Sequence, residues 1–271
     1  MKPVDFGYIA PRTVSDAIQI LSGEPRAKII AGGQTLGPML NLRLARPSLL
    51  VDITRIPDMV RVEVSADGMT LGACITHAAI EDGRVPDVTR GFLPAVAHGI
   101  AYRAVRNRGT IGGSLAHGDP AADWLSALMA LGAAVIVAGP ANRQRRQSLT
   151  TFARGAMTTA LAADEIITGV HIPNPGPAAR WGYHKICRKT GEFAEAIGIV
   201  IERGDGRRRC VAGATGGVPI ILAGAIDEDR PDWRRALSQS GYKGDAYDLE
   251  IHAIALERAN AEAFGRGGQN P

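Results

Sequence analysis

Apolar residues recur three and four positions apart in several stretches of the chain, which is the spacing of one face of an α-helix. The earliest stretch, residues 13–23, begins with a threonine at a capping position and ends at a glycine, so it predicts a short amphipathic helix. The same spacing predicts further helices over 38–44, 88–102, 121–131 and 245–264.

Short runs of mostly apolar residues lie between these helices and are typical of β-strands. The runs 61–65 and 69–73 flank Asp67-Gly68, a dipeptide that favours the tight turn of a β-hairpin. In the first two thirds of the chain we also expect strands at 27–30, 48–53 and 133–138.

Residues 174–177 read Asn-Pro-Gly-Pro and form the clearest break in the pattern, because proline and glycine interrupt helices and strands. Beyond this break, strand-like runs come first and a helix follows, which is the order expected of an α+β unit with an antiparallel sheet. The pattern therefore predicts two domains, 1–173 and 178–271. The strands of the second domain are expected at 181–188, 195–202, 209–214 and 219–223.

The composition narrows the classes of function. With 271 residues, 45% of them hydrophobic, the chain is long enough for two or three compact units. Its net charge is +4 and its pI is near 9.1, but the arginines are spread along the chain, with runs only at 143–146 and 207–209. Both runs lie in polar, turn-like stretches, so we expect solvated hairpin tips there and no binding of nucleic acid.

The cysteines and histidines do not form a metal-binding pattern. The three cysteines are far apart, so this chain alone cannot build a zinc or iron–sulfur site. No metal is therefore assigned, and hydrogen-bonded structural roles are expected for His77, His98 and His117. The N-terminus lacks an apolar leader, and no run of about 18 apolar residues occurs, so a cytoplasmic protein without a membrane span is expected.

Two glycine-containing loops are the candidate binding elements. Residues 31–35 (Ala-Gly-Gly-Gln-Thr) follow a predicted strand, and residues 110–114 (Thr-Ile-Gly-Gly-Ser) lie between 106–109 and 119–123. Glycine lets a phosphate come close enough to accept hydrogen bonds from backbone N–H groups. Neither loop has the glycine spacing of a Rossmann or P-loop motif, and either loop alone is as well explained by a structural turn. Together they predict a site for one pyrophosphate.

The order and separation of these motifs resemble the medium subunits of the xanthine dehydrogenase and carbon monoxide dehydrogenase (molybdenum hydroxylase) family. The resemblance extends through residues 36–39, 46–53 and 183–188, and so covers most of the chain. It implies an α+β protein with a two-subdomain FAD-binding fold of the vanillyl-alcohol oxidase (PCMH) type, over about 1–57 and 58–173. A smaller C-terminal α+β domain is implied as well.

The resemblance also implies which residues bind FAD, since in this family both glycine loops bracket the pyrophosphate. Lys185 matches a lysine near the flavin, where a cation stabilises negative charge on N1 of the reduced ring. Considered alone, Lys185 is better explained as a surface lysine on an edge strand, and Asp123 is equally well explained as a carboxylate in the first turn of a helix. The implied set is Ala31, Gly32, Gly33, Gln34, Thr35, Leu36, Ile100, Thr110, Ile111, Gly112, Gly113, Ser114, Asp123, Ile167 and Lys185.

The function that the resemblance implies is that of one subunit of an oxidoreductase complex. In the family, a small subunit carries two [2Fe-2S] clusters and a large subunit carries the molybdenum cofactor, so we expect a heterotrimer, single or dimerised. This chain then passes electrons from the clusters through FAD to an external acceptor. No catalytic residue is assigned from the sequence.

Three alternatives remain open. The first is a non-catalytic protein that carries FAD or assists assembly, and the second is a stand-alone flavin oxidoreductase of the same superfold, although no general acid for a substrate is recognisable. The third, a basic nucleic-acid-binding module, is disfavoured by the charge pattern. Since the first two also bind FAD, the motifs indicate the cofactor more firmly than the reaction.

Overall fold

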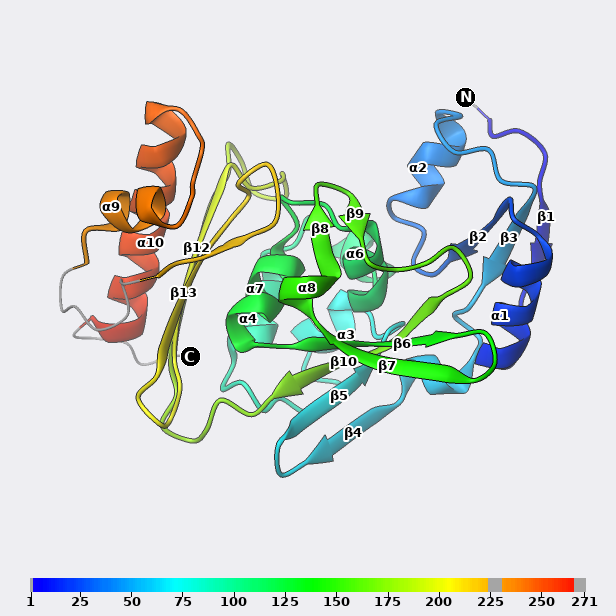
Figure 1. The fold of residues 1–271 in the computed structure, drawn as a ribbon, viewed down its shortest axis with the longest axis horizontal. Helices are drawn as coiled ribbons and strands as arrows, with labels where there is room; N and C mark the ends of the chain where they lie inside the picture. The colour runs from blue at the N-terminus through cyan, green and yellow to red at the C-terminus, as the bar shows by residue number, and fades with distance from the viewer. Residues whose placement is uncertain (1, 224–230, 266–271) are drawn as a thin grey trace.

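The computed structural model describes residues 2–223 and 231–265, and these form three parts in a row. Figure 1 shows an N-terminal part in blue, a central part in cyan and green around the largest sheet, and a C-terminal part in yellow to red. Met1, 224–230 and 266–271 lie outside the described residues. The first residue of the first predicted domain and the last six residues of the second are therefore not described.

The N-terminal part consists of a three-stranded parallel sheet and two helices: β1 (Gly7–Ile9), α1 (Val14–Gly23), β2 (Ala27–Ile30), α2 (Leu36–Asn41) and β3 (Leu49–Asp52). The strand order is β1-β3-β2. The helix predicted over 13–23 is confirmed, because Thr13 Oγ1 accepts a hydrogen bond from Asp16 N at 3.1 Å and caps the first turn.

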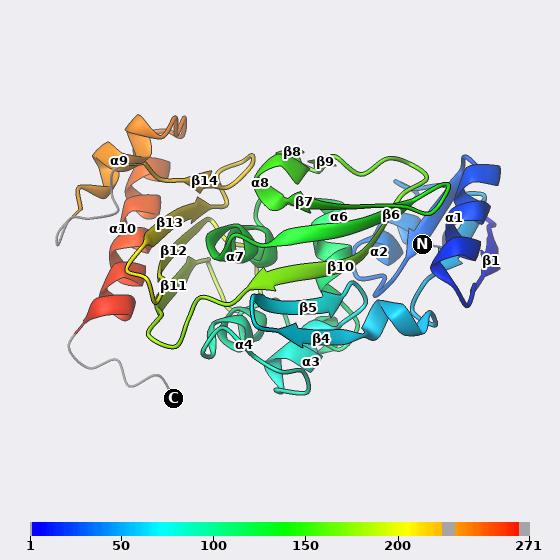
Figure 2. The ribbon, with the colours of Figure 1, turned by 60° about the horizontal axis from the view of Figure 1, so that its bottom comes forward.

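The central part is built on an antiparallel sheet of five strands: β4 (Val62–Ser65), β5 (Gly68–Gly72), β6 (Ala134–Gly139), β7 (Arg143–Ser148) and β10 (Ile166–Pro173). Figure 2 shows them edge to edge in the order β4-β5-β10-β6-β7. The predicted hairpin is confirmed, with Ser65 paired to Gly68. A Cβ atom on Gly68 would lie 2.2 Å from the carbonyl oxygen of Ile172 on β10, so only glycine fits at this corner.

Short helices and a small hairpin accompany this sheet: η1 (Pro57–Val60), α3 (His77–Glu81), α4 (Phe92–His98), α5 (Arg103–Arg106), α6 (Ile111–His117), α7 (Asp123–Leu131), α8 (Leu149–Phe152), β8 (Ala153–Gly155) and β9 (Thr158–Thr159). The helix expected over 121–131 is α7. The helix expected over 88–102 is shorter than predicted, because Arg90 and Gly91 take positive φ angles of 59° and 86° and α4 begins only after them.

The arginine-rich run 143–146 corrects a second expectation. It is not a hairpin tip, because it opens β7, an edge strand that pairs with β6 along its whole length. Arg145 forms an ion pair with Glu165 there. Charged residues on an edge strand hinder pairing with other chains, which explains the run without a nucleic-acid partner.

The C-terminal part is an antiparallel sheet with two helices: β11 (Arg180–Ile186), β12 (Ala196–Glu202), β13 (Arg208–Gly213), β14 (Ile220–Ile221), α9 (Trp233–Gln239) and α10 (Ala246–Phe264). The four strands and the long helix were predicted, and α9 was not. Glycines let α10 approach the sheet closely: a Cβ atom on Gly198 would lie 2.3 Å from the carbonyl carbon of Ala255.

One hydrophobic core extends from the N-terminal part into the C-terminal sheet. Its buried members include Val51 of β3, Leu128 of α7 and Ile199 of β12. Helix α7 contacts β10 of the central sheet as well as β12 and β13. The boundaries predicted at 173 and 178 stay predictions. Among the described helices, none combines the length and the apolar character needed to cross a membrane.

Candidate functional site

The two glycine loops lie against each other. Gly32 packs on the backbone just before the second loop, where a Cβ atom on Gly32 would lie 2.0 Å from Arg108 O and 2.9 Å from Gly109 Cα. No side chain fits in this space, so the contact between the loops requires glycine. The structure therefore brings residues 31–35 and 106–110 together, as a single binding site demands.

The first loop leaves a row of backbone donors without protein acceptors. Within the described residues, no acceptor contacts the N–H groups of Gly32, Gly33, Gln34 or Thr35. Gly33 has a φ of 71°, in the left-handed region, and Leu36 then opens α2. Successive N–H groups in such a turn form a concave site for an anion. Because Gln34 and Thr35 are exposed, an anion can reach this site from solution.

The second loop is the start of a helix and differs from the open turn that was expected. Thr110 caps α6, and its Oγ1 accepts a hydrogen bond from Gly113 N at 3.2 Å. Ile111 N and Gly112 N donate to carbonyl oxygens just beyond β5, at 3.0 and 2.9 Å, and Ser114 N donates to Thr110 O. The expectation that both loops offer free N–H groups is therefore wrong for this loop, in which Thr110 is buried and Ser114 is half-buried.

A buried arginine anchors the chain just before the second loop. The Arg106 guanidinium donates to both carboxylate oxygens of Glu81, at 2.7 and 2.9 Å, and to the carbonyl oxygens of Ile100 and Ala101, at 2.9 and 3.1 Å. The Arg106 and Glu81 side chains are only 10% and 12% exposed. The hydrogen bonds from Arg106 hold the pKa of Glu81 below its usual value. Arg106 thus fixes Ile100, a predicted contact residue, relative to the second loop.

His77 lies between the second loop and α7. Its backbone N donates to Gly109 O at 3.0 Å, and a Cβ atom on Gly109 would lie 2.7 Å from His77 Nε2. On the other side, Trp124 Nε1 donates to His77 Nδ1 at 2.9 Å, which requires a neutral ring protonated on Nε2. Burial lowers the pKa of His77 to about 4. The structural role expected for this histidine is confirmed.

Asp123 and Lys185 form a buried ion pair between α7 and β11. Lys185 Nζ lies 3.1 Å from Asp123 Oδ1 and donates to Asp123 Oδ2 and to Gly99 O, each at 3.2 Å. The Tyr183 hydroxyl donates to the same carboxylate. The Asp123 and Lys185 side chains are 7% and 10% exposed, so the interpretation of Lys185 as a surface lysine is wrong. Asp123, Tyr183 and Lys185 are called the Asp123 cluster below.

Burial and hydrogen bonding set the charges in the Asp123 cluster. Burial raises the pKa of the Asp123 carboxyl, while the Lys185 charge and the Tyr183 hydrogen bond act in the opposite direction. Burial, with the Asp123 charge, also raises the pKa of Tyr183 well above its ordinary value, so the phenol remains a donor. An ammonium group has three N–H donors, and within the described residues Asp123 and Gly99 are the acceptors of Lys185 Nζ. The third donor has no hydrogen-bond partner among the described residues.

The turn at 99–101 joins the two halves of the candidate site. Lys185 Nζ binds its first carbonyl oxygen, and Arg106 binds the next two. Ala101 has a φ of 43°, and this backbone is held in place by the two cations. The Asp123 cluster and the second loop are thus attached to the same short turn.

The remaining apolar candidates are placed by the core. Ile111 and Ile167 are both buried, so their side chains pack within the protein. Ile167 precedes Thr168, whose carbonyl oxygen accepts a hydrogen bond from Ala73 N at 3.1 Å, and Ala73 O in turn accepts from Gly112 N. Ile167 is therefore next to the backbone that holds the second loop. A direct contact with a cofactor stays a prediction for these residues.

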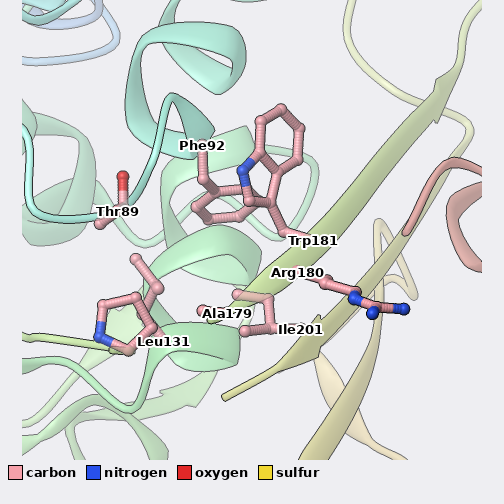
Figure 3. A pocket seen from close by; sticks show the side chains of 8 residues that line it. Thr89, Phe92, Leu131, Ala179, Arg180, Trp181 and Ile201 are labelled. Atoms are coloured by element: carbon pink, nitrogen blue, oxygen red, sulfur yellow. The ribbon is translucent and has the colours of Figure 1, made fainter. Parts of the chain in front are cut away.

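A small pocket lies apart from the glycine loops, beside the start of β11 (Figure 3). Trp181 and Phe92 meet there with ring centroids 5.5 Å apart, and Trp181 Nε1 donates to Arg90 O at 2.9 Å. None of the predicted FAD-binding residues lines it, so we assign these side chains a packing role. The lining residues are Thr89, Phe92, Leu131, Pro175, Ala179, Arg180, Trp181 and Ile201.

Three residues of the site had no role assigned from the sequence: Tyr183, Arg106 and Glu81. Tyr183 and Lys185 are two positions apart on one strand and so point to the same face, a signal that could have identified Tyr183. No comparable signal exists for Glu81. It lies on α3 and meets Arg106 of α5 only in the folded protein.

Comparison with known sequences identifies relatives along nearly the whole chain. The family model described as FAD binding domain in molybdopterin dehydrogenase matches residues 4–175. The nicotine 6-hydroxylase medium subunit of Paenarthrobacter nicotinovorans is 36% identical over 269 residues, covering 95% of this chain and 93% of that protein. The carbon monoxide dehydrogenase medium chain of Afipia carboxidovorans is 34% identical, covering 98% of this chain and 99% of that protein.

Solved structures share the fold. Carbon monoxide dehydrogenase from Hydrogenophaga pseudoflava, in a form that lacks the Mo-pyranopterin moiety of the molybdenum cofactor, superposes with a TM-score of 0.89 at 29% identity, over 97% of this chain and 98% of that chain. Quinoline 2-oxidoreductase from Pseudomonas putida 86 gives 0.86 at 31% identity, with coverages of 97% and 98%. The α+β fold expected from the sequence, an FAD-binding fold followed by a smaller C-terminal domain, is confirmed.

Proposed function

We propose, because the chain belongs to the family of FAD-binding medium subunits of molybdenum hydroxylases, that it binds FAD between its two glycine loops and transfers electrons within an oxidoreductase complex. The observation that carries the proposal is the row of N–H donors at residues 32–35, which have no acceptor in the described part of the chain and lie beside the backbone just before the second loop. When bound, FAD accepts electrons one at a time and releases them in pairs.

In this proposal the first loop binds the pyrophosphate. Among the described residues, no acceptor competes for the N–H groups from Gly32 to Thr35, which therefore suit a group with several anionic oxygens. Thr110 and Ser114 contribute hydroxyl groups from the second loop. Ala31, Leu36, Ile100, Ile111, Gly112, Gly113 and Ile167 complete the proposed surroundings of the cofactor.

Lys185 is proposed to face the flavin ring with its remaining N–H donor. A cation at this point stabilises the negative charge of the reduced ring. Asp123 holds the Lys185 side chain in place through an ion pair of 3.1 Å. The role of this pair is thus to orient a cation at a largely dehydrated position.

The proposed subunit composition of the complex is based on the names of the related proteins. The relatives above are named as a medium subunit and a medium chain, and one related structure is described as a form that lacks the Mo-pyranopterin moiety of the molybdenum cofactor. We propose that a large partner subunit carries the molybdenum cofactor and a small one carries the [2Fe-2S] clusters that reduce FAD, in a heterotrimer. The electron-transfer direction, the domain boundaries and the cytoplasmic location stay predictions.

FAD binding is tested on the complex purified through a tag on this chain. We expect one FAD per chain, released by denaturation and distinguished from FMN by chromatography. Gly32→Ala is expected to lose most of the FAD, because its Cβ atom collides with Arg108 O. Gly37→Ala adds the same methyl group where no atom lies within 4 Å, so it serves as the matched control.

A wild-type complex without flavin, or equal FAD contents in the two glycine variants, would contradict the proposal. The partner subunits are tested on the same sample by mass spectrometry and metal analysis. Molybdenum and iron are expected together with FAD. A flavoprotein that purifies with neither molybdenum nor iron would instead support an assembly protein or a stand-alone oxidoreductase.

A further inference from the structure

We propose that Tyr183 is a positioning residue for Lys185: its hydroxyl holds the Asp123 carboxylate, so that the lysine keeps a net positive field toward the flavin and raises the flavin midpoint potential. The inference rests on the proposed function, which places FAD beside Lys185. The inference adds Tyr183 and the sign of its effect on the flavin midpoint potential, neither of which is part of the proposed function.

The geometry of β11 makes Tyr183 and Lys185 a matched pair of donors. They point to the same face of the strand and converge on the Asp123 carboxylate. Lys185 Nζ lies 3.1 Å from Oδ1 and 3.2 Å from Oδ2 of this carboxylate, and the Tyr183 hydroxyl donates to it as well. On β12 they pair with Ile199 and Ile197, both fully buried. The backbone that carries both donors is therefore held by the core.

The electrostatic consequence follows from sharing the carboxylate. A buried carboxylate that interacts with two donors has part of its negative charge offset by each of them, and in a low dielectric these interactions are strong. Without the hydroxyl, the carboxylate interacts with Lys185 alone and neutralises it more completely. The positive field at the third N–H of Lys185, where the proposed flavin lies, then becomes smaller.

A purely structural joint between α7 and β11 is the competing explanation, because the same contacts also hold these elements together. The two explanations differ in what they predict. A joint changes stability and leaves the potential of bound FAD unchanged. A positioning residue changes the potential, and its effect disappears when Lys185 is absent.

The experiment measures the flavin midpoint potential by anaerobic redox titration of the purified complex, together with thermal stability. Tyr183→Phe is expected to lower the potential by about 30 mV, which for a two-electron couple is a tenfold weaker stabilisation of reduced FAD. Asp123→Asn removes the counter-charge and is expected to raise the potential. The opposite signs are not expected from a general loss of structure.

Two further variants complete the design. Tyr242→Phe is the matched control, because it also removes a hydroxyl that is hydrogen bonded, to His252 Nδ1 at 3.0 Å, in the C-terminal part. It is expected to leave the potential unchanged. Lys185→Met is expected to lower the potential, and the double variant with Tyr183→Phe is expected to match Lys185→Met alone.

Each result has a defined meaning. A Tyr183→Phe complex that loses thermal stability but keeps the wild-type potential overturns the inference in favour of a structural joint. A Lys185→Met complex that retains FAD at the wild-type potential also overturns it, while FAD binding itself stands. A wild-type complex without FAD is recognised before any titration and overturns the proposed function as well.

Discussion

His77 shows how one buried side chain links stability to the position of a binding loop. It touches Gly109 on one side and accepts a hydrogen bond from Trp124 on the other, so its ring must be neutral. In the unfolded chain an ordinary histidine has a pKa near 6.5, whereas burial lowers that of His77 to about 4. Between these values the unfolded state binds the proton and the folded state does not.

The sign of the pH effect follows directly. The free energy of unfolding rises with pH from about 4 to 6.5, and the contribution of His77 is lost as the pH falls through this window. At pH 5 we expect a loss of about 2 kcal/mol relative to pH 7, measured by urea unfolding. His77→Gln cannot be protonated and is expected to show a smaller slope. If the free energy of unfolding depended on pH with the same slope in the wild type and in His77→Gln, groups other than His77 would cause the pH dependence.

At the scale of elements, the short helices α3 and α5 are held together by charge as well as by packing. The Arg106 and Glu81 side chains are only 10% and 12% exposed, and removing Arg106 leaves Glu81, within the described residues, with only its exposed partners, Arg103 and His98. Arg103, on the same helix, pairs with Glu81 and Asp82 but is 48% exposed. Exposed pairs contribute little because water screens them.

These two arginines therefore form a matched comparison. Arg106→Met is expected to lower the free energy of unfolding by about 3–5 kcal/mol, and Arg103→Met by less than about 1 kcal/mol. Urea unfolding of both variants measures the difference. Because Arg106 also binds the 99–101 turn, its variant is expected to retain less FAD. Similar losses for the two variants would contradict the assigned role of burial.

At the scale of the whole molecule, the C-terminal sheet shares its core with the rest of the chain. Ile197, Ile199 and Ile201 of β12 are buried in the cluster that also contains α7 and the central sheet. The other face of the sheet has its own cluster against α10, including Val200 and Leu256. The sheet thus depends on apolar contacts with two partners.

A fragment of residues 178–271 is therefore expected not to fold independently, since it would expose one face of its sheet to water. Calorimetry should show no cooperative transition for it, and a hydrophobic dye should bind. As a control, the full chain with a protease site at 174–177, cut after folding, is expected to stay associated. A cooperative transition of the isolated fragment would contradict this prediction.

Local patterns were sufficient for elements whose signals lie within one segment. The capped helix at 13–23, the hairpin across Asp67-Gly68 and the four C-terminal strands are of this kind. The pattern was insufficient where a turn depends on left-handed backbone, as at Arg90 and Gly91, or where a glycine loop continues into a helix, as in α6. In both cases distant segments contribute contacts: Trp181 Nε1 donates to Arg90 O, and Gly112 N donates to Ala73 O.

The amino-acid sequence by itself determined the family, the cofactor class and the two glycine loops, because these depend on residue types in a fixed order. Only the tertiary structure decided that Gly32 meets Arg108, that the free donors belong to the first loop, and that Asp123, Tyr183 and Lys185 form one cluster. The physical reason is that hydrogen-bond satisfaction and burial depend on partners from distant segments, which a local pattern does not contain.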